Sequence, residues 1–247
     1  MKNQIIQGDC LEIMPNIPDK SIDMILCDLP YGTTACKWDT IIPFEHLWKQ
    51  YERIIKDNGA IVLTASQPFT SILVMSNLKM FKYEWIWLKD KPSNFMLAKK
   101  QPLKYHENIL IFYKNQPMYN PNMEIRLEKD KRKNKSRLNK NNICNTKLYC
   151  KESKGNDDYI YPKSYQKFNK ERGKNEHPTQ KPVALFEYLI RTYTNEGDLV
   201  LDNCAGSGTT GVACKNLGRK FILIEKEKKY IEIINKRIKA IPELLLV

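Results

Sequence analysis

Two short segments of the chain combine residue types that could carry out chemistry on a bound molecule. Asp28-Leu29-Pro30-Tyr31 follows an apolar run and supplies a carboxylate, a backbone carbonyl beside a rigid ring, and an aromatic plane. Asp202-Asn203-Cys204-Ala205-Gly206-Ser207-Gly208 follows a second apolar run, and its two glycines allow a tight turn that a ligand can approach closely. The first segment therefore predicts a polar recognition site, and the second predicts a ligand-binding loop.

The glycine-rich loop has the features of a nucleotide-type site without a phosphate. Glu225 ends the next predicted strand about twenty residues further on, where its carboxylate can accept both hydroxyls of a ribose. The third glycine of the dinucleotide fingerprint is missing, because Gly211 comes three residues after Gly208, and the loop lacks the Gly-Lys-Ser/Thr of a phosphate-binding loop. A cofactor with an adenosine but no phosphate fits this pattern best, and S-adenosylmethionine is such a cofactor. The simpler alternative is a tight turn followed by a surface glutamate.

The segment at Asp28 suits methyl transfer to an exocyclic amino group of a nucleic-acid base. Such a nitrogen is a poor nucleophile, since its lone pair is delocalised into the ring. The Asp28 carboxylate and the Leu29 carbonyl before Pro30 can accept both N–H bonds and draw the nitrogen toward tetrahedral geometry, and Tyr31 can stack on the base. A base in a duplex must leave the stack to reach such a pocket. Alternatively, the segment is an ordinary turn that ends a strand.

Five segments resemble the motifs of amino-methylating DNA methyltransferases, which act on adenine N6 or cytosine N4. Residues 7–12 (QGDCLE) resemble the GDxLE of many members, residues 28–31 (DLPY) the catalytic [DNS]PP[YFW] motif, and residues 107–112 (ENILIF) an internal strand motif. Residues 177–182 (HPTQKP) resemble HPxxKP, and residues 202–208 (DNCAGSG) resemble the cofactor loop DPFxGSG. The matches extend from about residue 5 to 240, except for a basic insert. The catalytic motif precedes the cofactor loop, an order that resembles the beta group of the family.

The resemblance implies an S-adenosylmethionine-dependent enzyme that methylates double-stranded DNA, with Asp28, Pro30 and Tyr31 as catalytic residues. Asp9 would hydrogen-bond the adenine amino group of the cofactor, or cap a helix that begins near Leu11, or both. Lys181 would line the methionine end of the cofactor site, or simply begin a helix after a proline turn. The residues implied for cofactor binding are Asp9, Lys181, Asp202, Ala205, Gly206, Gly208 and Glu225.

Two positions depart from the family pattern. Leu29 replaces the first proline, which makes the loop less rigid, and Asn203-Cys204 replaces the Pro-Phe that packs over the adenosine of the cofactor. The Asp28 carboxylate, Pro30, Tyr31 and the glycines are retained, so we expect an active enzyme. An aspartate at position 28 resembles the adenine-specific members, and we expect adenine N6 as the target. The alternatives are cytosine N4, an RNA or protein substrate, and a DNA-binding protein that no longer methylates.

The elements that must position these residues alternate between strand and helix. Apolar runs predict strands at 21–27, 60–64, 83–88, 108–113, 199–202 and 221–225. Apolar stripes with helical spacing predict helices at 44–56, 69–78, 184–193, 209–217 and 229–241. The alternation predicts an α/β fold with a single mostly parallel, doubly wound, Rossmann-like sheet that both halves of the chain share.

The positive charge of the chain is concentrated in one segment. Lys and Arg number 41 against 28 Asp and Glu, a net charge of +13, which predicts a polyanionic partner. Residues 126–174 alone hold 16 Lys and Arg and 6 Asp and Glu, interleaved with aromatic residues, a composition typical of nucleic-acid surfaces. We interpret the chain as one catalytic domain, 1–247, with a basic insert at about 115–176 that recognises target DNA. The alternative is a solvated Lys/Asn-rich loop. The residues expected to contact DNA are Lys131, Arg132, Lys133 and Arg137.

The composition argues against other classes of protein. No stretch approaches the roughly 20 apolar residues of a membrane span, and residues 1–10 lack the apolar run of a signal peptide. The 7 cysteines contain no Cys-x-x-Cys pair, and the 3 histidines complete no zinc pattern. We expect a cytoplasmic protein with reduced thiols, no metal and no membrane contact. The resemblance also allows a homodimer.

Overall fold

The computed structural model describes residues 2–34, 36, 39–127, 158–169 and 180–242. The chain divides into two compact units, of which the larger comprises residues 1–120 and 164–247 and the smaller comprises residues 121–163. Among the described residues, each unit contains its own sheet, with eight strands in the larger unit and two in the smaller.

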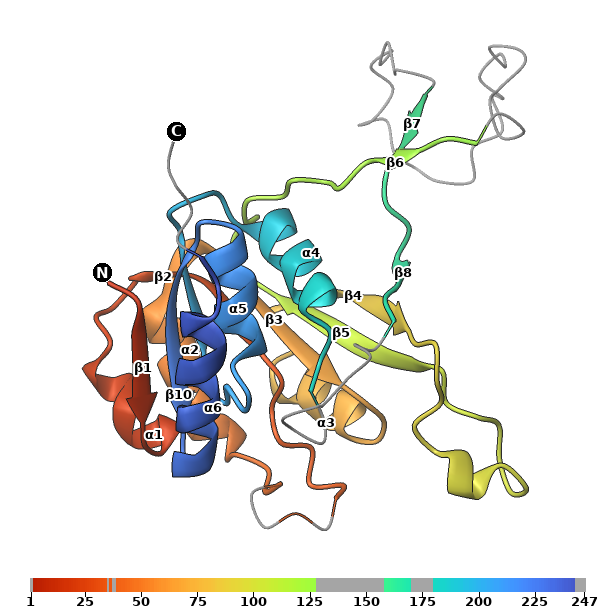
Figure 1. The fold of residues 1–247 in the computed structure, drawn as a ribbon, viewed down its shortest axis with the longest axis horizontal. Coiled ribbons are helices and arrows are strands. Elements are labelled where there is room, and N and C mark those ends of the chain that lie inside the picture. Colours follow the sequence, from red (N-terminus) through yellow and green to blue (C-terminus); the bar gives the residue numbers. More distant parts are fainter. Residues whose placement is uncertain (1, 35, 37–38, 128–157, 170–179, 243–247) are drawn as a thin grey trace. The chain divides into compact units, whose positions relative to one another are not determined.

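The larger unit is built on one sheet with the strand order β1-β10-β9-β2-β3-β5-β4-β8 (Figure 1). The pairs are parallel except for those that β5 makes with β3 and β4, which are antiparallel. The predicted α/β fold with a mostly parallel sheet shared by both halves of the chain is therefore confirmed. The strands are β1 (Gln4–Gln7), β2 (Ile22–Cys27), β3 (Ile55–Ala65), β4 (Phe81–Leu88), β5 (His106–Phe112), β8 (Tyr165–Lys167), β9 (Leu199–Asp202) and β10 (Lys220–Glu225).

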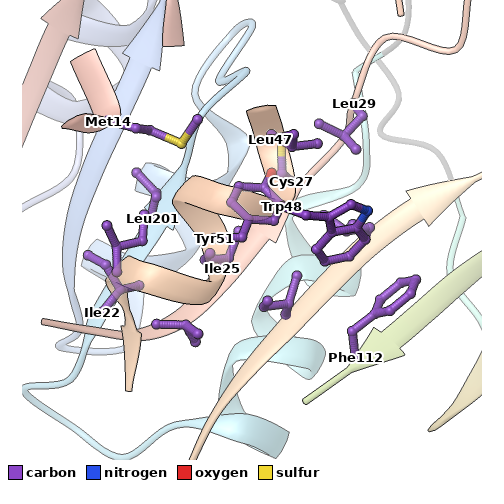
Figure 2. Packing of buried hydrophobic residues seen from close by; sticks show 14 of the residues in the cluster. Met14, Ile22, Ile25, Cys27, Leu29, Leu47, Trp48, Tyr51, Phe112 and Leu201 are labelled. Atoms are coloured by element: carbon purple, nitrogen blue, oxygen red, sulfur yellow. The ribbon is translucent and has the colours of Figure 1, made fainter. Parts of the chain in front are cut away.

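Helices cover both faces of this sheet, which makes the fold doubly wound (Figure 1). Alternate residues of β2 point to opposite faces. Ile25 and Cys27 join an apolar cluster with α1, α2 and α3, whereas Met24 and Leu26 join a second cluster with α4, α5 and α6. Figure 2 shows the first cluster, to which α2 contributes Trp48. The helices are α1 (Cys10–Ile13), α2 (Phe44–Ile54), α3 (Phe69–Ser76), α4 (Val183–Tyr193), α5 (Thr209–Asn216) and α6 (Lys228–Lys239).

The junction between α2 and β3 differs from the predicted boundary. The apolar stripe predicts a helix up to residue 56, but α2 ends two residues earlier and β3 begins directly after it. The register of the two strands shifts here, because Ile22 and Met24 of β2 pair with Ile55 and Ala60 of β3. The extra residues of β3 between these pairs form a bulge. Lys56 is held there by an ion pair with Asp23 of β2. Gly59 permits the close approach, since a Cβ atom at this position would lie 2.9 Å from the Asp23 carbonyl oxygen. Contacts with β2 thus override the helical pattern.

The smaller unit contains a short antiparallel pair, β6 (Glu124–Ile125) with β7 (Tyr159–Ile160). Beyond this pair, the Arg126 backbone N–H donates to the Asp158 carbonyl oxygen at 2.7 Å. The unit falls within the predicted basic insert at about 115–176. Lys131, Arg132, Lys133 and Arg137 lie outside the described residues, so their expected role in DNA binding stays a prediction.

Candidate active site

The loops after β2 and β9 line one cavity of about 1040 Å³. The two strands are parallel neighbours, so their carboxyl ends meet at the same edge of the sheet, which is where open α/β sheets bind ligands. The volume is at the upper end of the usual range for small-molecule sites, roughly 300–1,000 Å³. The predicted site residues that line this cavity are Asp9, Asp28, Pro30, Tyr31, Lys181, Asp202, Ala205, Gly206 and Glu225.

The carboxylate of Glu225 is fixed at the wall of the cavity by two backbone groups. Its Oε2 accepts from the Gly206 N–H and its Oε1 accepts from the Glu227 N–H, each at 2.8 Å. Gly206 has a φ of +52°, in the left-handed region that favours glycine. Burial raises the pKa of Glu225 above its ordinary value. Each of its oxygens retains a further lone pair, so the carboxylate can accept hydroxyl groups of a ligand while it remains bound to the loop.

Asp9 both caps a helix and lines the cavity. Its Oδ1 accepts from the Leu11 N–H at 2.9 Å, which caps α1 as one of the two sequence-based alternatives predicts. Its Oδ2 accepts from Lys226 Nζ at 3.2 Å. The carboxylate also belongs to the cavity wall. This end of the cavity is acidic on balance, because Asp9, Glu225 and Glu227 outnumber Lys226 and Lys229 in its lining. It suits a ligand with hydroxyl or amino groups.

Two of the predicted cofactor-binding residues, Gly208 and Asp202, fix the shape of the loop after β9. Gly208 has a φ of +79° at the start of α5, and a Cβ atom there would lie 2.9 Å from Ile234 of α6. Gly208 is absent from the residues that line the cavity, in the part of the chain that the structure describes. Asp202 is buried and accepts from the Cys204 N–H at 3.1 Å and from the Thr210 hydroxyl. Burial raises the pKa of Asp202 to about 6.

The Asn203-Cys204 departure from the family pattern has a structural counterpart in α2. The buried Asn203 Oδ1 accepts from the hydroxyl of Tyr51. This bond ties the cofactor loop to α2 across 152 positions of the chain. The sequence places Tyr51 in an apolar helical stripe, and nothing in that pattern distinguishes its hydroxyl from a core aromatic ring. Asn203 thus contributes a buried polar contact to the position where the family motif has proline.

Asp28 lies at the centre of a cluster of donors. Its Oδ1 accepts from the hydroxyls of Tyr31, at 2.8 Å, and of Thr64. Lys181 Nζ donates to both carboxylate oxygens at 2.7 Å. The Tyr31 ring stacks on Phe69 with a centroid distance of 5.0 Å and an interplanar angle of 23°. Burial and the charge of Asp28 raise the pKa of Tyr31 well above its ordinary value. The hydroxyl bonds and the ring stack thus fix the orientation of Tyr31.

Lys181 connects Asp28 to a second buried ion pair. Its Nζ lies 3.4 Å from Glu107 Oε2, and Lys89 Nζ lies 3.0 Å from Glu107 Oε1. Burial disfavours the ammonium form of Lys181, but Asp28, Tyr31 and Glu107 outweigh this effect and hold its pKa well above its ordinary value. Burial would raise the pKa of Glu107, but Lys181 and Lys89 lower it. Lys181 is therefore neither a plain lysine at a helix start nor remote from the Asp28 loop.

Sequence reasoning misses three members of this cluster. Thr64 reads as the end of an apolar strand, and Lys89 as the polar residue after one. Glu107 is noted only as the first residue of a strand motif. One sequence signal could have identified the charged members: an acidic residue or a lysine at the end of an apolar run. Such a residue places its charge where the strands of a sheet end. The pairing partners, however, depend on the order of the strands.

The residues present fit S-adenosylmethionine. The acidic end of the cavity offers Glu225 for ribose hydroxyls and Asp9 for an amino group, and neither carboxylate would favour a phosphate. The cavity then continues to Asp28 and Tyr31. A doubly wound, mostly parallel sheet with such a cavity at its carboxyl edge defines a protein of the S-adenosylmethionine-dependent methyltransferase class. The chain belongs to the N6_N4_Mtase family of DNA methylases, which it matches over residues 22–236.

Individual relatives agree with this family. The chain is 29% identical to the type II methyltransferase M.HpaI of Haemophilus parainfluenzae over 254 residues, covering 96% of the chain and 74% of that protein. It is 30% identical to M.HinfI of Haemophilus influenzae over 267 residues, covering 97% of the chain and 69% of that protein. The resemblance to amino-methylating DNA methyltransferases is thereby confirmed.

Solved structures agree with the fold and the cofactor. The complex of M1.HpyAVI with S-adenosylmethionine has a TM-score of 0.66 and 27% identity, covering 96% of this chain and 99% of that chain. The cytosine-N4-specific PvuII DNA methyltransferase has a TM-score of 0.67 at 16% identity, covering 98% of this chain and 89% of that chain. At this identity the similarity shows only that the fold is shared. The predicted cofactor, S-adenosylmethionine, is confirmed.

Other observations concern metals, thiols and membranes. Among the described residues, no group of three or more His, Cys, Asp and Glu side chains could hold a metal ion. The five described cysteines are free thiols. No helix within the described part of the chain is long and apolar enough to cross a membrane.

Proposed function

We propose that this protein transfers a methyl group to the N6 amino group of adenine in duplex DNA, after the base has turned out of the helix into the cavity. The observation that carries the proposal is the continuity of the cavity from Glu225 and Gly206 to Asp28 and Tyr31. It allows one ligand to bind at the acidic end while a second molecule reaches the Asp28 loop. Bound S-adenosylmethionine supplies the methyl group.

Asp28 and the backbone after it would position the target nitrogen. The Asp28 carboxylate and the Leu29 carbonyl before Pro30 accept the two N–H bonds, which turns the lone pair of the nitrogen toward the methyl donor. Holding the reacting atoms in line contributes much of such a rate enhancement. Leu29 lacks the ring of the proline that it replaces, but its side chain is buried in the cluster of Figure 2, so packing holds the loop instead.

Tyr31 and its neighbours would hold the base. Phe69 supports the Tyr31 ring, and the hydroxyls of Tyr31 and Thr64 keep Asp28 in place. A base that stacks on such a ring gains about 1–3 kcal/mol. This gain offsets part of the cost of unpairing and unstacking the base, which is a few kcal/mol.

Adenine is favoured as the target because an aspartate stands at position 28, as in adenine-specific members of the family. The names of M.HpaI and M.HinfI support a role as the methyltransferase of a type II restriction-modification system. Binding to DNA would depend largely on the basic insert, and the predicted cytoplasmic location agrees with a DNA substrate. A homodimer remains part of the proposal.

Analysis of the methylated nucleoside tests the proposal. Purified protein is incubated with labelled S-adenosylmethionine and duplex DNA, and the digested product is separated by mass spectrometry. We expect N6-methyladenine, formed about 10²- to 10³-fold more slowly with Asp28→Asn. Glu232→Gln, which changes an exposed carboxylate on α6, is the matched control and should methylate normally. N4-methylcytosine as the product would contradict the choice of adenine, and transfer to RNA or protein alone would contradict the substrate.

A further inference from the structure

Four charged side chains form an alternating chain at the end of the cavity near the Asp28 loop. Lys89 contacts Glu107, Glu107 lies next to Lys181, and Lys181 contacts Asp28. The side chains are 0%, 13%, 7% and 23% exposed, respectively. Two positive and two negative charges make the chain neutral, which is the condition under which buried charges are tolerated.

Both oxygens of the Asp28 carboxylate already accept hydrogen bonds. Its Oδ1 accepts from Tyr31, Thr64 and Lys181, and its Oδ2 accepts from Lys181 at 2.7 Å. A carboxylate has about four lone-pair sites. A target amino group that donates an N–H to Asp28 would therefore compete with the ammonium group of Lys181 for the same oxygens.

Glu107 offers Lys181 a second acceptor. Its Oε2 is buried and has no hydrogen-bond partner among the described residues, although it lies 3.4 Å from Lys181 Nζ. Charge-assisted N–H···O bonds are about 2.7–2.9 Å long. A shift of the ammonium group by less than about 1 Å would therefore complete a hydrogen bond that Glu107 lacks. Lys89 occupies the other oxygen of Glu107 and keeps the carboxylate facing Lys181.

We propose that Lys181 exchanges carboxylates when the substrate binds: it leaves Asp28 for Glu107 Oε2, and the target amino group takes its place on Asp28. Lys181, Glu107 and Lys89 are positioning residues in this exchange. The inference rests on the proposed role of Asp28 as the acceptor of the target amino group. No proton is transferred and no charge is created, so the cluster stays neutral throughout.

The exchange also has an electrostatic consequence for the reaction. The new N–C bond replaces the S–C bond of the methyl donor, and the target nitrogen gains positive charge until it releases one of its two protons to solvent. An ammonium group hydrogen-bonded to Asp28 would oppose that charge. On Glu107, Lys181 is paired with a carboxylate that it shares with Lys89 and that does not contact the target nitrogen. Asp28 then faces the reacting nitrogen without the two hydrogen bonds from Lys181, so its charge stabilises the transition state more than the ground state.

Two substitutions and their combination test the exchange by steady-state methylation of duplex DNA. Glu107→Gln removes the negative charge that would attract Lys181 away from Asp28. Lys181 then stays on Asp28, and kcat should fall by on the order of 10- to 100-fold. The KM for S-adenosylmethionine should change by less than about threefold, because the other end of the cavity is intact. Adding Lys181→Met removes the competing ammonium group and leaves Lys89 and Asp28 balanced. The double variant should therefore be at least about tenfold faster than Glu107→Gln alone.

If Lys181 has a purely structural role, the double variant should not be faster than Glu107→Gln alone. The double variant would then be as slow as Glu107→Gln or slower, and this result would overturn the exchange. Lys82→Met, which changes an exposed lysine on β4, is the matched control and should have no effect on either background.

A second measurement does not depend on the folding of Glu107→Gln. In full-length wild-type protein with ¹⁵N-labelled lysine, the Nζ signal that Lys181→Met removes should shift when methylatable duplex DNA is added, and an unchanged signal would overturn the exchange. Asp28→Asn separates the two proposals. If Asp28→Asn methylates at the wild-type rate, the proposed function of Asp28 fails. If it is inactive while Glu107→Gln is as fast as the wild type, only the exchange fails.

Discussion

Replacing Asp28 by asparagine should reduce methyl transfer far more than it reduces binding. The side chain keeps its size but loses its charge and one of its two acceptor oxygens. In the proposed reaction it accepts from a nitrogen that becomes positive, so its loss should cost at least as much as one preorganised transition-state hydrogen bond, about 3–4 kcal/mol. Since roughly 1.4 kcal/mol corresponds to a factor of ten, the rate should fall by about 10²- to 10³-fold.

The same substitution should weaken the fold only moderately. Lys181 would lose a carboxylate 2.7 Å away, and leaving a buried charge without a partner costs about 3–5 kcal/mol. Lys181 keeps Glu107 at 3.4 Å as a second partner, so we expect a loss of about 2 kcal/mol. For a chain of this size the Tm should then fall by about 4–8 °C.

Single-turnover methyl transfer to duplex DNA at saturating S-adenosylmethionine measures the effect on the chemical step. DNA affinity, measured by fluorescence anisotropy, should stay close to that of the wild type, because phosphate contacts elsewhere dominate it. A folded Asp28→Asn protein whose transfer rate lies within about threefold of the wild-type rate would refute the reasoning. The loop after β2 would then not be the place where the target nitrogen reacts.

Three further predictions concern the cofactor, the fold and DNA. Glu225→Gln should weaken S-adenosylmethionine binding by about 1.5–3 kcal/mol, because charge-assisted bonds to the ribose become neutral; calorimetry with unchanged affinity would contradict the ribose role. Gly208→Ala should destabilise the fold by about 1–3 kcal/mol, because a φ of +79° is strained for alanine and its Cβ would lie 2.9 Å from an isoleucine of α6; an unchanged denaturation midpoint would speak against this packing. Replacing Lys131, Arg132 and Lys133 by alanine should flatten the salt dependence of DNA binding by about 0.9 per lost phosphate contact. An unchanged slope would favour a solvated loop.

Much of the fold could be predicted from local pattern. Apolar runs such as the one ending at Cys27 identify buried strands, and Gly206 and Gly208 mark the turn after β9. These features depend on a few neighbouring residues, so the sequence contains them directly. The direction of β5 could not be predicted, because an apolar run has the same pattern in either orientation. The boundary after α2 was also missed, since it depends on contacts with β2 that lie about 30 positions away in the chain.

The site was predictable in its parts but not in its connections. Asp28, Glu225 and Asp9 stand at strand ends, and the type of residue at a strand end suggests its chemistry. The contact between Lys181 and Asp28 joins residues 153 positions apart, and it depends on the packing of α4, which begins just after Lys181, against β2. The sequence suggested the methionine end of the cofactor for Lys181, which stays a prediction, but it gave no sign of the contact with Asp28 that the structure shows.

The strand order has a consequence for how the protein is made on the ribosome. β1 pairs with β10 and β2 pairs with β9, so two strands from the end of the chain lie between two strands from its beginning. Until Leu199–Glu225 has been synthesised, β2 has an open edge, and an unpaired edge is a template for aggregation. The ligand cavity also requires these last strands, since Asp202 and Glu225 end them. A chain that lacks these strands therefore has no place for the methyl donor, and it exposes the edge of β2 until β9 has been synthesised.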